Sequence, residues 1–281
     1  MRNESFGFRH PILYVMERGR YSKAEIESFV HSLLTDGFCV LPEHFDRAKL
    51  AAWGEAFAPL LERHIEHEGR VQNRGARRYY VTLPFELPFA DPEVFEDEDI
   101  LAVVKGLMGE DAVMCQFATD TPLFGSDSQD IHRDAPPLFP ETGDETPPFQ
   151  LAVNFPLVDV ITDNGPFEVA RGTHMMLKEQ ALRCIESGAV RLEPLLLRIG
   201  DVVIRDVRGL HRGTPNRTQT PRPMVVIGYS RRWLFRPEVS IQIPRAVYEK
   251  LSDRARFLLR FNPVVDSLDE EGREIYQSFA Y

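Results

Sequence analysis

The chain has 281 residues, 43% of them hydrophobic, and a formal charge of −10 at pH 7. A chain of this length can bury one large core, so we expect a single domain over residues 1–281, with its core at about 110–235 and supporting helices at 22–107 and 244–260. The acidic balance argues against nucleic acid as a partner, because neutralising a phosphate backbone needs clustered Lys and Arg. No apolar run approaches the roughly 20 residues of a membrane span. The three cysteines lack a C-x-x-C spacing, which predicts reduced thiols and a cytoplasmic protein.

Helices are expected first. Ser22 and Glu25 form a capping box ahead of apolar residues at helical spacing, which predicts a helix over 22–35. A strand follows over 38–41, and Asp46 then caps a second helix with an apolar stripe. We expect these helices to support a β barrel from outside.

The next segment contains a loop, a helix and a strand. Residues 69–91 are polar first and aromatic afterwards, and Pro84 and Pro88 exclude a regular central strand, which favours a surface loop with an aromatic anchor. A short amphipathic helix is expected over 97–107, followed by a strand over 112–118. The apolar face of that strand is expected to hold Val113, Cys115 and Phe117.

A candidate metal site begins after this strand. In extended backbone, alternate side chains share one face, so His132 and Asp134 can both bind one cation. His211, which follows the apolar strand pattern 202–204, is the best third ligand. Two imidazoles and one carboxylate leave open metal positions, the arrangement that suits ferrous iron in oxygenases. By itself, the H-x-D pair is more typical of a solvated loop than of a metal site.

Arg222 strengthens the metal hypothesis. It begins the apolar run 224–227, and a guanidinium near a metal-bound His matches a carboxylate with two parallel hydrogen bonds. We therefore expect a co-substrate with a carboxylate remote from the metal.

Between these motifs, the proline-rich segment 135–150 cannot pair as a strand, so it forms either a lid over the open metal positions or a flexible loop. Alternating apolar residues over 151–157 predict a strand that turns Asn154 to the opposite face. Asp163-Asn164-Gly165 predicts a tight turn. The last core strand is expected over 222–232. One face of this strand would hold Arg222, Met224, Val226, Gly228 and Ser230.

Many short alternating strands with flanking helices predict a mainly β fold, a double-stranded β-helix or jelly-roll, cupin-like barrel. A further helix is expected over 175–187, and another over 244–259.

Three motifs resemble the phytanoyl-CoA dioxygenase family of iron(II)- and 2-oxoglutarate-dependent oxygenases. They read QDIHRD at 129–134, NGPFEVARGTH at 164–174 and GDVVIRDVRGLHRGTPNRTQTPRP at 200–223. The resemblance implies the same barrel, Fe(II) held by His132, Asp134 and His211, O2, and 2-oxoglutarate bound by Arg222. Gln129 and Asn154 are candidates for further contacts with the co-substrate.

The resemblance also bears on residues outside the triad. The family usually has Pro-Gly-Ser-His where this chain has Arg171-Gly172-Thr173-His174, and the complete triad makes His174 structural. In the family, the stretch equivalent to 69–91 lines the pocket, so a pocket wall is an alternative to the surface loop. Related halogenases lack the carboxylate of Asp134, so its presence favours hydroxylation.

The resemblance implies that the chain oxidises, most simply hydroxylates, a small organic molecule in a natural-product pathway, with release of succinate and CO2. Aromatic residues suggest a flat or apolar substrate, although core packing explains each one equally well: Tyr79, Phe85, Phe139 and Trp233. One alternative is an acyl-CoA 2-hydroxylase that uses Arg74, Arg77 and Arg78 for the phosphates. Others are an oxygen-independent cupin-like metal protein and a non-catalytic scaffold, and a homodimer stays open.

Overall fold

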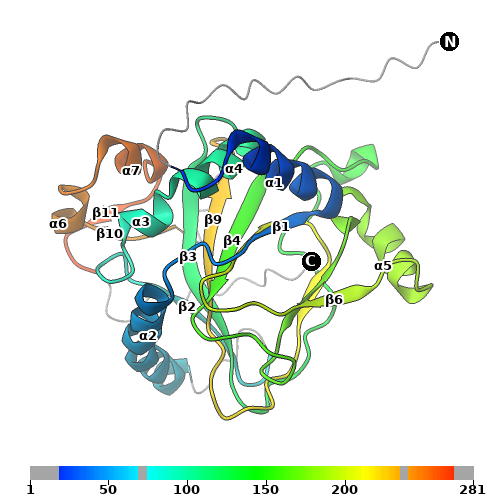
Figure 1. Ribbon diagram of the computed structural model, residues 1–281, viewed down its shortest axis with the longest axis horizontal. Helices are drawn as coiled ribbons and strands as arrows, with labels where there is room; N and C mark the ends of the chain where they lie inside the picture. Colours follow the sequence, from blue (N-terminus) through cyan, green and yellow to red (C-terminus); the bar gives the residue numbers. More distant parts are fainter. Residues whose placement is uncertain (1–18, 69–74, 235–239, 269–281) are drawn as a thin grey trace.

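Two main β-sheets, a small two-stranded sheet and a layer of helices make up the structure, a computed structural model that describes residues 19–68, 75–234 and 240–268 (Figure 1). The strands are β1 Phe38–Leu41, β2 Arg78–Thr82, β3 Val113–Pro122, β4 Gln150–Pro156, β5 Phe167–Ala170, β6 Leu192–Leu195, β7 Val202–Asp206, β8 His211–Gly213, β9 Met224–Ser230, β10 Ile243–Pro244 and β11 Val264–Val265. The helices are α1 Lys23–Asp36, α2 Arg47–Glu68, α3 Pro92–Phe95, α4 Glu98–Met108, α5 Lys178–Glu186, α6 Arg245–Tyr248 and α7 Asp253–Leu258. Single 3-10 turns lie at Pro140–Thr142 and Thr173–Met175.

The first helices begin where the sequence predicts. Ser22 accepts a hydrogen bond from the backbone N–H of Glu25, whose carboxylate accepts from the backbone of Ser22, so the capping box of α1 is complete. Gly37 ends α1 with φ of 86°, in the left-handed region that glycine adopts at low cost. Asp46 accepts a hydrogen bond from the backbone N–H of Lys49 in the first turn of α2.

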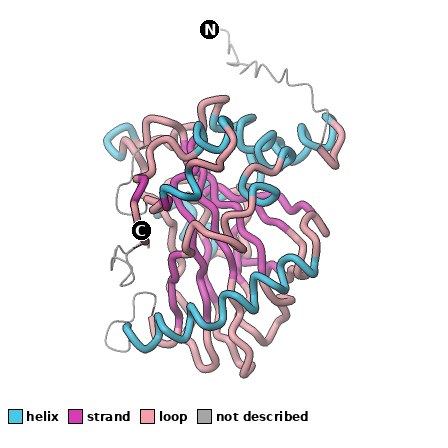
Figure 2. The backbone as a smooth tube through the Cα atoms, turned by 90° about the vertical axis from the view of Figure 1, so that its left-hand side faces the viewer, coloured by secondary structure: helices cyan, strands magenta, loops and turns pink. Residues whose placement is uncertain are grey.

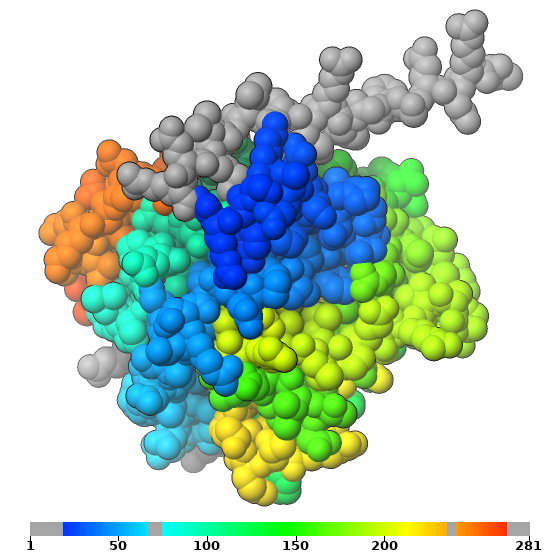
Figure 3. All heavy atoms as spheres, viewed as in Figure 1, coloured from blue at the N-terminus to red at the C-terminus, as the bar shows by residue number. Residues whose placement is uncertain are grey.

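The larger sheet has six strands in the order β1-β7-β4-β9-β3-β2, with antiparallel pairing throughout. Along each strand, successive side chains point to opposite faces of the sheet, except at a bulge in β3. One face packs against α1, α2 and α4 in the main core, and it includes Leu151, Val153, Phe155, Val202, Ile204, Val225, Ile227 and Tyr229. Figure 2 shows the long helix α2 running across the strands, and Figure 3 shows α1 and α2 covering this side of the molecule.

The opposite face of the large sheet meets a three-stranded sheet, β6-β5-β8. A second apolar cluster lies between the sheets and includes Phe38, Val169, Leu197, Val203 and Met224. In the described part of the chain the two sheets stay separate, so the predicted jelly roll is confirmed as a sandwich whose sheets do not close into a continuous barrel. The space between the sheets is where the predicted motifs meet.

The strands differ from the prediction at two places. Residues 78–82, expected in a loop, form β2 at the edge of the large sheet, and Pro84 and Pro88 lie beyond its end. In β3 the pairing register shifts between Met114 and Gln116. This β-bulge turns Met114 and Phe117 towards the core, so the predicted face through Val113, Cys115 and Phe117 is wrong in part.

Two predicted helices are shorter than expected. The one expected over 175–187 begins only at Lys178. The one expected over 244–259 is two helices, α6 and α7, because Ser252 accepts a hydrogen bond from the backbone N–H of Ala255 and starts a new helix. No helix within the described ranges is both long and apolar enough to cross a membrane.

Candidate active site

Backbone pairing brings the three predicted metal ligands together. The segment that carries His132 runs antiparallel to the start of β8, and the backbones of His132 and His211 exchange two hydrogen bonds of 3.0 Å. The backbone N–H of Asp134 donates to the carbonyl of Val207 at 2.9 Å. These bonds fix the register between two motifs that are far apart in sequence.

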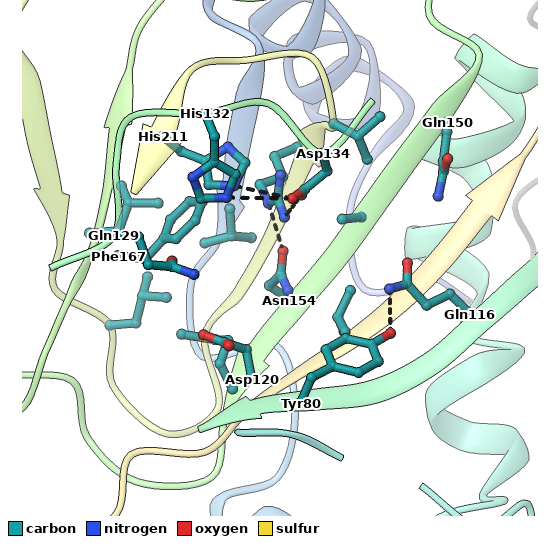
Figure 4. Close-up of a pocket in the computed structure, with 18 of the residues that line it drawn as sticks. Tyr80, Gln116, Asp120, Gln129, His132, Asp134, Gln150, Asn154, Phe167 and His211 are labelled. Carbon is teal, nitrogen blue, oxygen red and sulfur yellow. Dashed lines mark hydrogen bonds and ion pairs between the residues drawn. The ribbon is translucent and has the colours of Figure 1, made fainter. Parts of the chain in front are cut away.

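The three ligand atoms converge in this register. Oδ1 of Asp134 lies 3.4 Å from Nε2 of His211 and 3.9 Å from Nε2 of His132. One ligand atom from each residue lies within 4.8 Å of the others, and Figure 4 shows both imidazoles and the carboxylate directed at one another. Two nitrogens and one oxygen at this spacing suit a single Fe(II) ion with open positions opposite the protein ligands.

The second nitrogen of each imidazole sets the ring orientation. Nδ1 of His132 lies 2.7 Å from the carbonyl oxygen of Asp130, and Nδ1 of His211 lies 2.9 Å from that of Gly209. A carbonyl only accepts, so Nδ1–H donates in both rings and Nε2 keeps its lone pair for a metal. The tautomers of both histidines therefore fit metal binding.

Arg205 controls the charge of Asp134. Burial raises the pKa of this carboxyl, but the guanidinium of Arg205 and the imidazoles of His211 and His132 outweigh burial and hold the pKa well below its usual range. Nη2 of Arg205 lies 2.6 Å from Oδ2 of Asp134. The carboxylate is therefore ionised at neutral pH, as a metal ligand must be.

Arg222 is buried deep in the same pocket, with 1% of its surface exposed. Burial, with the nearby Arg78 guanidinium, lowers its pKa to about 10, so it is charged at neutral pH. Its Nη2 donates to the carbonyl of Gly165 at 2.8 Å, whereas its buried Nε has no partner in the described structure. A buried cation with an unsatisfied N–H fits a carboxylate ligand.

The pocket lies between the two sheets and is partly open to solvent. Gln129 and Asn154 line it, and their contacts with the co-substrate stay a prediction. Oε1 of Gln129 accepts from the backbone N–H of Gly213 at 2.9 Å. The amide of Asn154 donates to the carbonyl of Val225 at 3.1 Å and accepts from Nε of Arg205 at 3.1 Å.

Several residues that line the pocket were not predicted from the sequence. Arg205 is the most important of them. A charged residue after three apolar ones in a strand could have drawn attention to it, because Arg205 shares the pocket face with Val203 and Val207. Figure 4 shows a second polar group on the other side of the pocket from the imidazoles, where Nε2 of Gln116 donates to the Tyr80 hydroxyl at 2.5 Å.

The aromatic residues proposed for the pocket lie elsewhere. Tyr79 and Phe85 belong to the main core, so core packing, the alternative given for them, explains these two residues. Phe139 and Trp233 are 52% and 58% exposed and are absent from the pocket lining. Phe167 lines the pocket instead, with its ring centroid 4.8 Å from that of His211.

His174 is structural, as the sequence predicted. Its ring packs against Gly37, and its Nε2 lies 3.2 Å from the carbonyl oxygen of Leu34, so it joins the turn after β5 to the end of α1. Another group of possible metal ligands consists of His44, Asp97 and Asp99, in which Nε2 of His44 lies 2.9 Å from Oδ1 of Asp97. Both carboxylates already accept backbone N–H groups, which explains the cluster without a ligand.

Comparison with solved structures shows the same fold at low sequence identity. EvdMO1 is 20% identical with a TM-score of 0.57, and the match covers 74% of this chain and 50% of EvdMO1, so this chain spans about half of that protein's length. The epimerase SnoN, solved in complex with Fe3+, alpha ketoglutarate and nogalamycin RO, is 18% identical with a TM-score of 0.56, over 75% of this chain and 85% of SnoN.

HygX from Streptomyces hygroscopicus, solved with nickel, 2-oxoglutarate and hygromycin B, is 20% identical with a TM-score of 0.55, over 77% of this chain and 90% of HygX. The family model for phytanoyl-CoA dioxygenase (PhyH) matches residues 33–224, which include all three candidate ligands and Arg222. The chain therefore belongs to the phytanoyl-CoA dioxygenase family of iron(II)- and 2-oxoglutarate-dependent oxygenases.

Proposed function

We propose that this chain hydroxylates an uncharged small organic molecule in a natural-product pathway, consuming O2 and 2-oxoglutarate and releasing succinate and CO2. The observation that carries the proposal is the pocket itself. It holds the convergent Nε2, Nε2 and Oδ1 atoms of the triad together with the buried, partly unsatisfied guanidinium of Arg222.

Each residue then has a defined task. His132, Asp134 and His211 would hold Fe(II), and Arg222 would pair with the remote carboxylate of 2-oxoglutarate. When bound, iron and 2-oxoglutarate supply the oxidising power that breaks a C–H bond of the substrate. The sheet faces exclude bulk water and hold the substrate carbon near the open metal positions.

The lining of the pocket supports an uncharged, oxygenated substrate. Tyr80, Gln116 and Gln150 offer neutral hydrogen-bonding groups on the side away from the imidazoles. Apolar side chains of Leu195, Leu197, Met224 and Val226 form much of the remaining wall. SnoN and HygX were solved with the natural products nogalamycin RO and hygromycin B, which supports a natural product as the substrate.

The acyl-CoA alternative has less support. Arg78 is 1% exposed and pairs with Asp120 at 2.9 Å, so it does not belong to a surface site for phosphates. Arg77 is exposed, and Arg74 lies outside the described residues. Turnover of a free small molecule compared with its CoA thioester separates the two substrate classes.

Anaerobic titration tests the co-substrate assignment. Fe(II) and 2-oxoglutarate added together should give a weak visible charge-transfer band, and Arg222→Ala should weaken 2-oxoglutarate binding. Arg212→Ala is the matched control, because Arg212 pairs with Glu168 and is absent from the pocket lining. Absence of the band in folded, iron-loaded wild-type protein would contradict the proposal and favour an oxygen-independent metal protein.

A substrate screen tests the reaction outcome. Candidate molecules should stimulate succinate release, and the hydroxylated product should contain one oxygen atom from labelled O2. Stimulated succinate release without incorporated label would instead indicate epimerisation or ring closure, as in the structurally similar epimerase SnoN and carbocyclase SnoK.

A further inference from the structure

Arg205 is a buried cation beside the candidate metal ligands, although it follows three apolar residues in its strand. It is 8% exposed and projects from β7 into the pocket, whereas its neighbours Val202 and Ile204 face the main core. A buried guanidinium is costly unless its N–H groups are satisfied. The partners of each nitrogen therefore indicate what the residue does.

Two of the three guanidinium nitrogens of Arg205 already have hydrogen-bond partners. Nη2 binds Oδ2 of Asp134 at 2.6 Å, and Nε donates to Oδ1 of Asn154 at 3.1 Å. The ring of Phe167 lies 5.1 Å from the guanidinium carbon and supports one of its faces. Nη1 is buried and has no partner within the described structure.

The contact with Asp134 fixes which carboxylate oxygen faces the metal site. Oδ2 is held by Arg205, and Oδ1 faces the imidazole nitrogens at 3.4 and 3.9 Å. The arginine therefore favours binding of the metal through one oxygen, which keeps further metal positions open for ligands.

The remaining N–H fits an anionic oxygen beside the metal. The proposed co-substrate is a dianion, and Arg222 accounts for one of its carboxylates. Nη1 of Arg205 and Nε of Arg222 are both buried without a partner, and both residues line the same pocket.

Building on the proposed function, we propose that Arg205 is a positioning residue with two contacts. Its Nη2 restricts Asp134 to binding the metal through Oδ1, and its Nη1 donates to the carboxylate next to the keto group of 2-oxoglutarate. The co-substrate would then meet one arginine at each end.

Binding of two 2-oxo acids to Co(II)-loaded protein separates the arginines. 2-Oxovalerate retains the carboxylate next to the keto group but lacks the remote one. Arg205→Met should lower the affinity for both acids by similar factors, about ten- to a hundredfold, because each acid loses one charged hydrogen bond. Arg222→Met should weaken 2-oxoglutarate and leave 2-oxovalerate unchanged, and Arg212→Met should leave both unchanged. Unchanged affinity for both acids in Arg205→Met, or loss for 2-oxoglutarate alone, would overturn the proposal.

The Co(II) spectrum supplies a readout that does not depend on turnover. Arg205→Met should alter the visible ligand-field bands, because Oδ2 of Asp134 is released to the metal, and an unchanged spectrum would contradict the positioning role. Arg205→Lys provides a second variant if the methionine variant does not fold. It keeps the charge near Asp134 but carries all its donors on one nitrogen, which cannot replace both Nη1 and Nη2. The Co(II) spectrum should therefore be retained and the affinity for both acids lost. If wild-type Co(II) protein binds neither acid, the proposed function fails before Arg205 is tested.

Discussion

Arg133, which lies between two candidate metal ligands in sequence, forms a buried ion pair of 2.6 Å with Glu145. Its side chain points away from the metal face, as the alternation of extended backbone requires. Glu145 also lies 3.4 Å from Arg208, in the turn that precedes His211. One carboxylate from the proline-rich segment 135–149 thus contacts both backbone segments that carry metal ligands.

Glu145→Gln should destabilise the protein by about 3–5 kcal/mol, because the buried Arg133 guanidinium loses its charged partner and Arg208, which keeps Asp206, loses a second one. The free energy of unfolding from urea titration measures the effect. Glu141→Gln is the matched control in the same segment, because Glu141 is exposed. Equal stability of both variants would show that the Glu145 contacts contribute little.

His211→Ala should abolish metal binding in isothermal titration while largely keeping the fold, because the main core lies on the other face of the large sheet. His174→Ala should give the opposite result. His174 is equally buried but contacts the end of α1, so its loss should lower the melting temperature and leave metal affinity unchanged. Loss of metal binding in both variants would indicate a general effect of removing a buried imidazole.

Much of the site could be predicted from the sequence, because it depends on the alternation of side chains between the two faces of extended backbone. The period-two pattern over residues 151–157 predicted that Asn154 faces away from the core, and it lines the pocket. The same rule paired His132 with Asp134, and the structure brings His211 to them through backbone pairing with the segment of His132. A pattern of this kind fixes the face of a side chain without any knowledge of its partners.

Other features depend on long-range contacts or on an extra residue. The bulge in β3 shifts the register after Met114, and no apolar alternation reveals such an insertion in advance. The role of Arg205 became visible only when Asp134 and Asn154 were placed beside it in space. Sequence could show that a charge interrupts a buried strand, but not which groups compensate it.

Gly228→Ala should disturb the substrate side of the pocket. A Cβ atom at this position would lie 2.7 Å from Cβ of Gln116 and 2.9 Å from its Oε1, so the side chain of Gln116 would have to move. The expected cost is about 1–3 kcal/mol for overpacking, with weaker substrate binding. Gln116→Gly in the same protein should recover much of the lost stability. A double-mutant cycle of unfolding free energies that shows no coupling would contradict this contact.

Cys39 is the basis of a pH-dependent prediction, because burial raises the pKa of its thiol to about 12 from an ordinary value of 9.0. The unfolded state loses this proton first, so the contribution of Cys39 to stability is complete below pH 9 and decreases as the pH rises from 9 towards 12. The decrease approaches about 1.4 kcal/mol per pH unit within this window. Unfolding free energies at pH 8 and pH 10.5 should therefore fall more in the wild type than in Cys39→Ala. Equal decreases in the two proteins would assign the alkaline loss to other groups. As an independent check, Cys39 in the native protein should react with a thiol reagent at pH 8 more slowly than the half-buried Cys115 and Cys184.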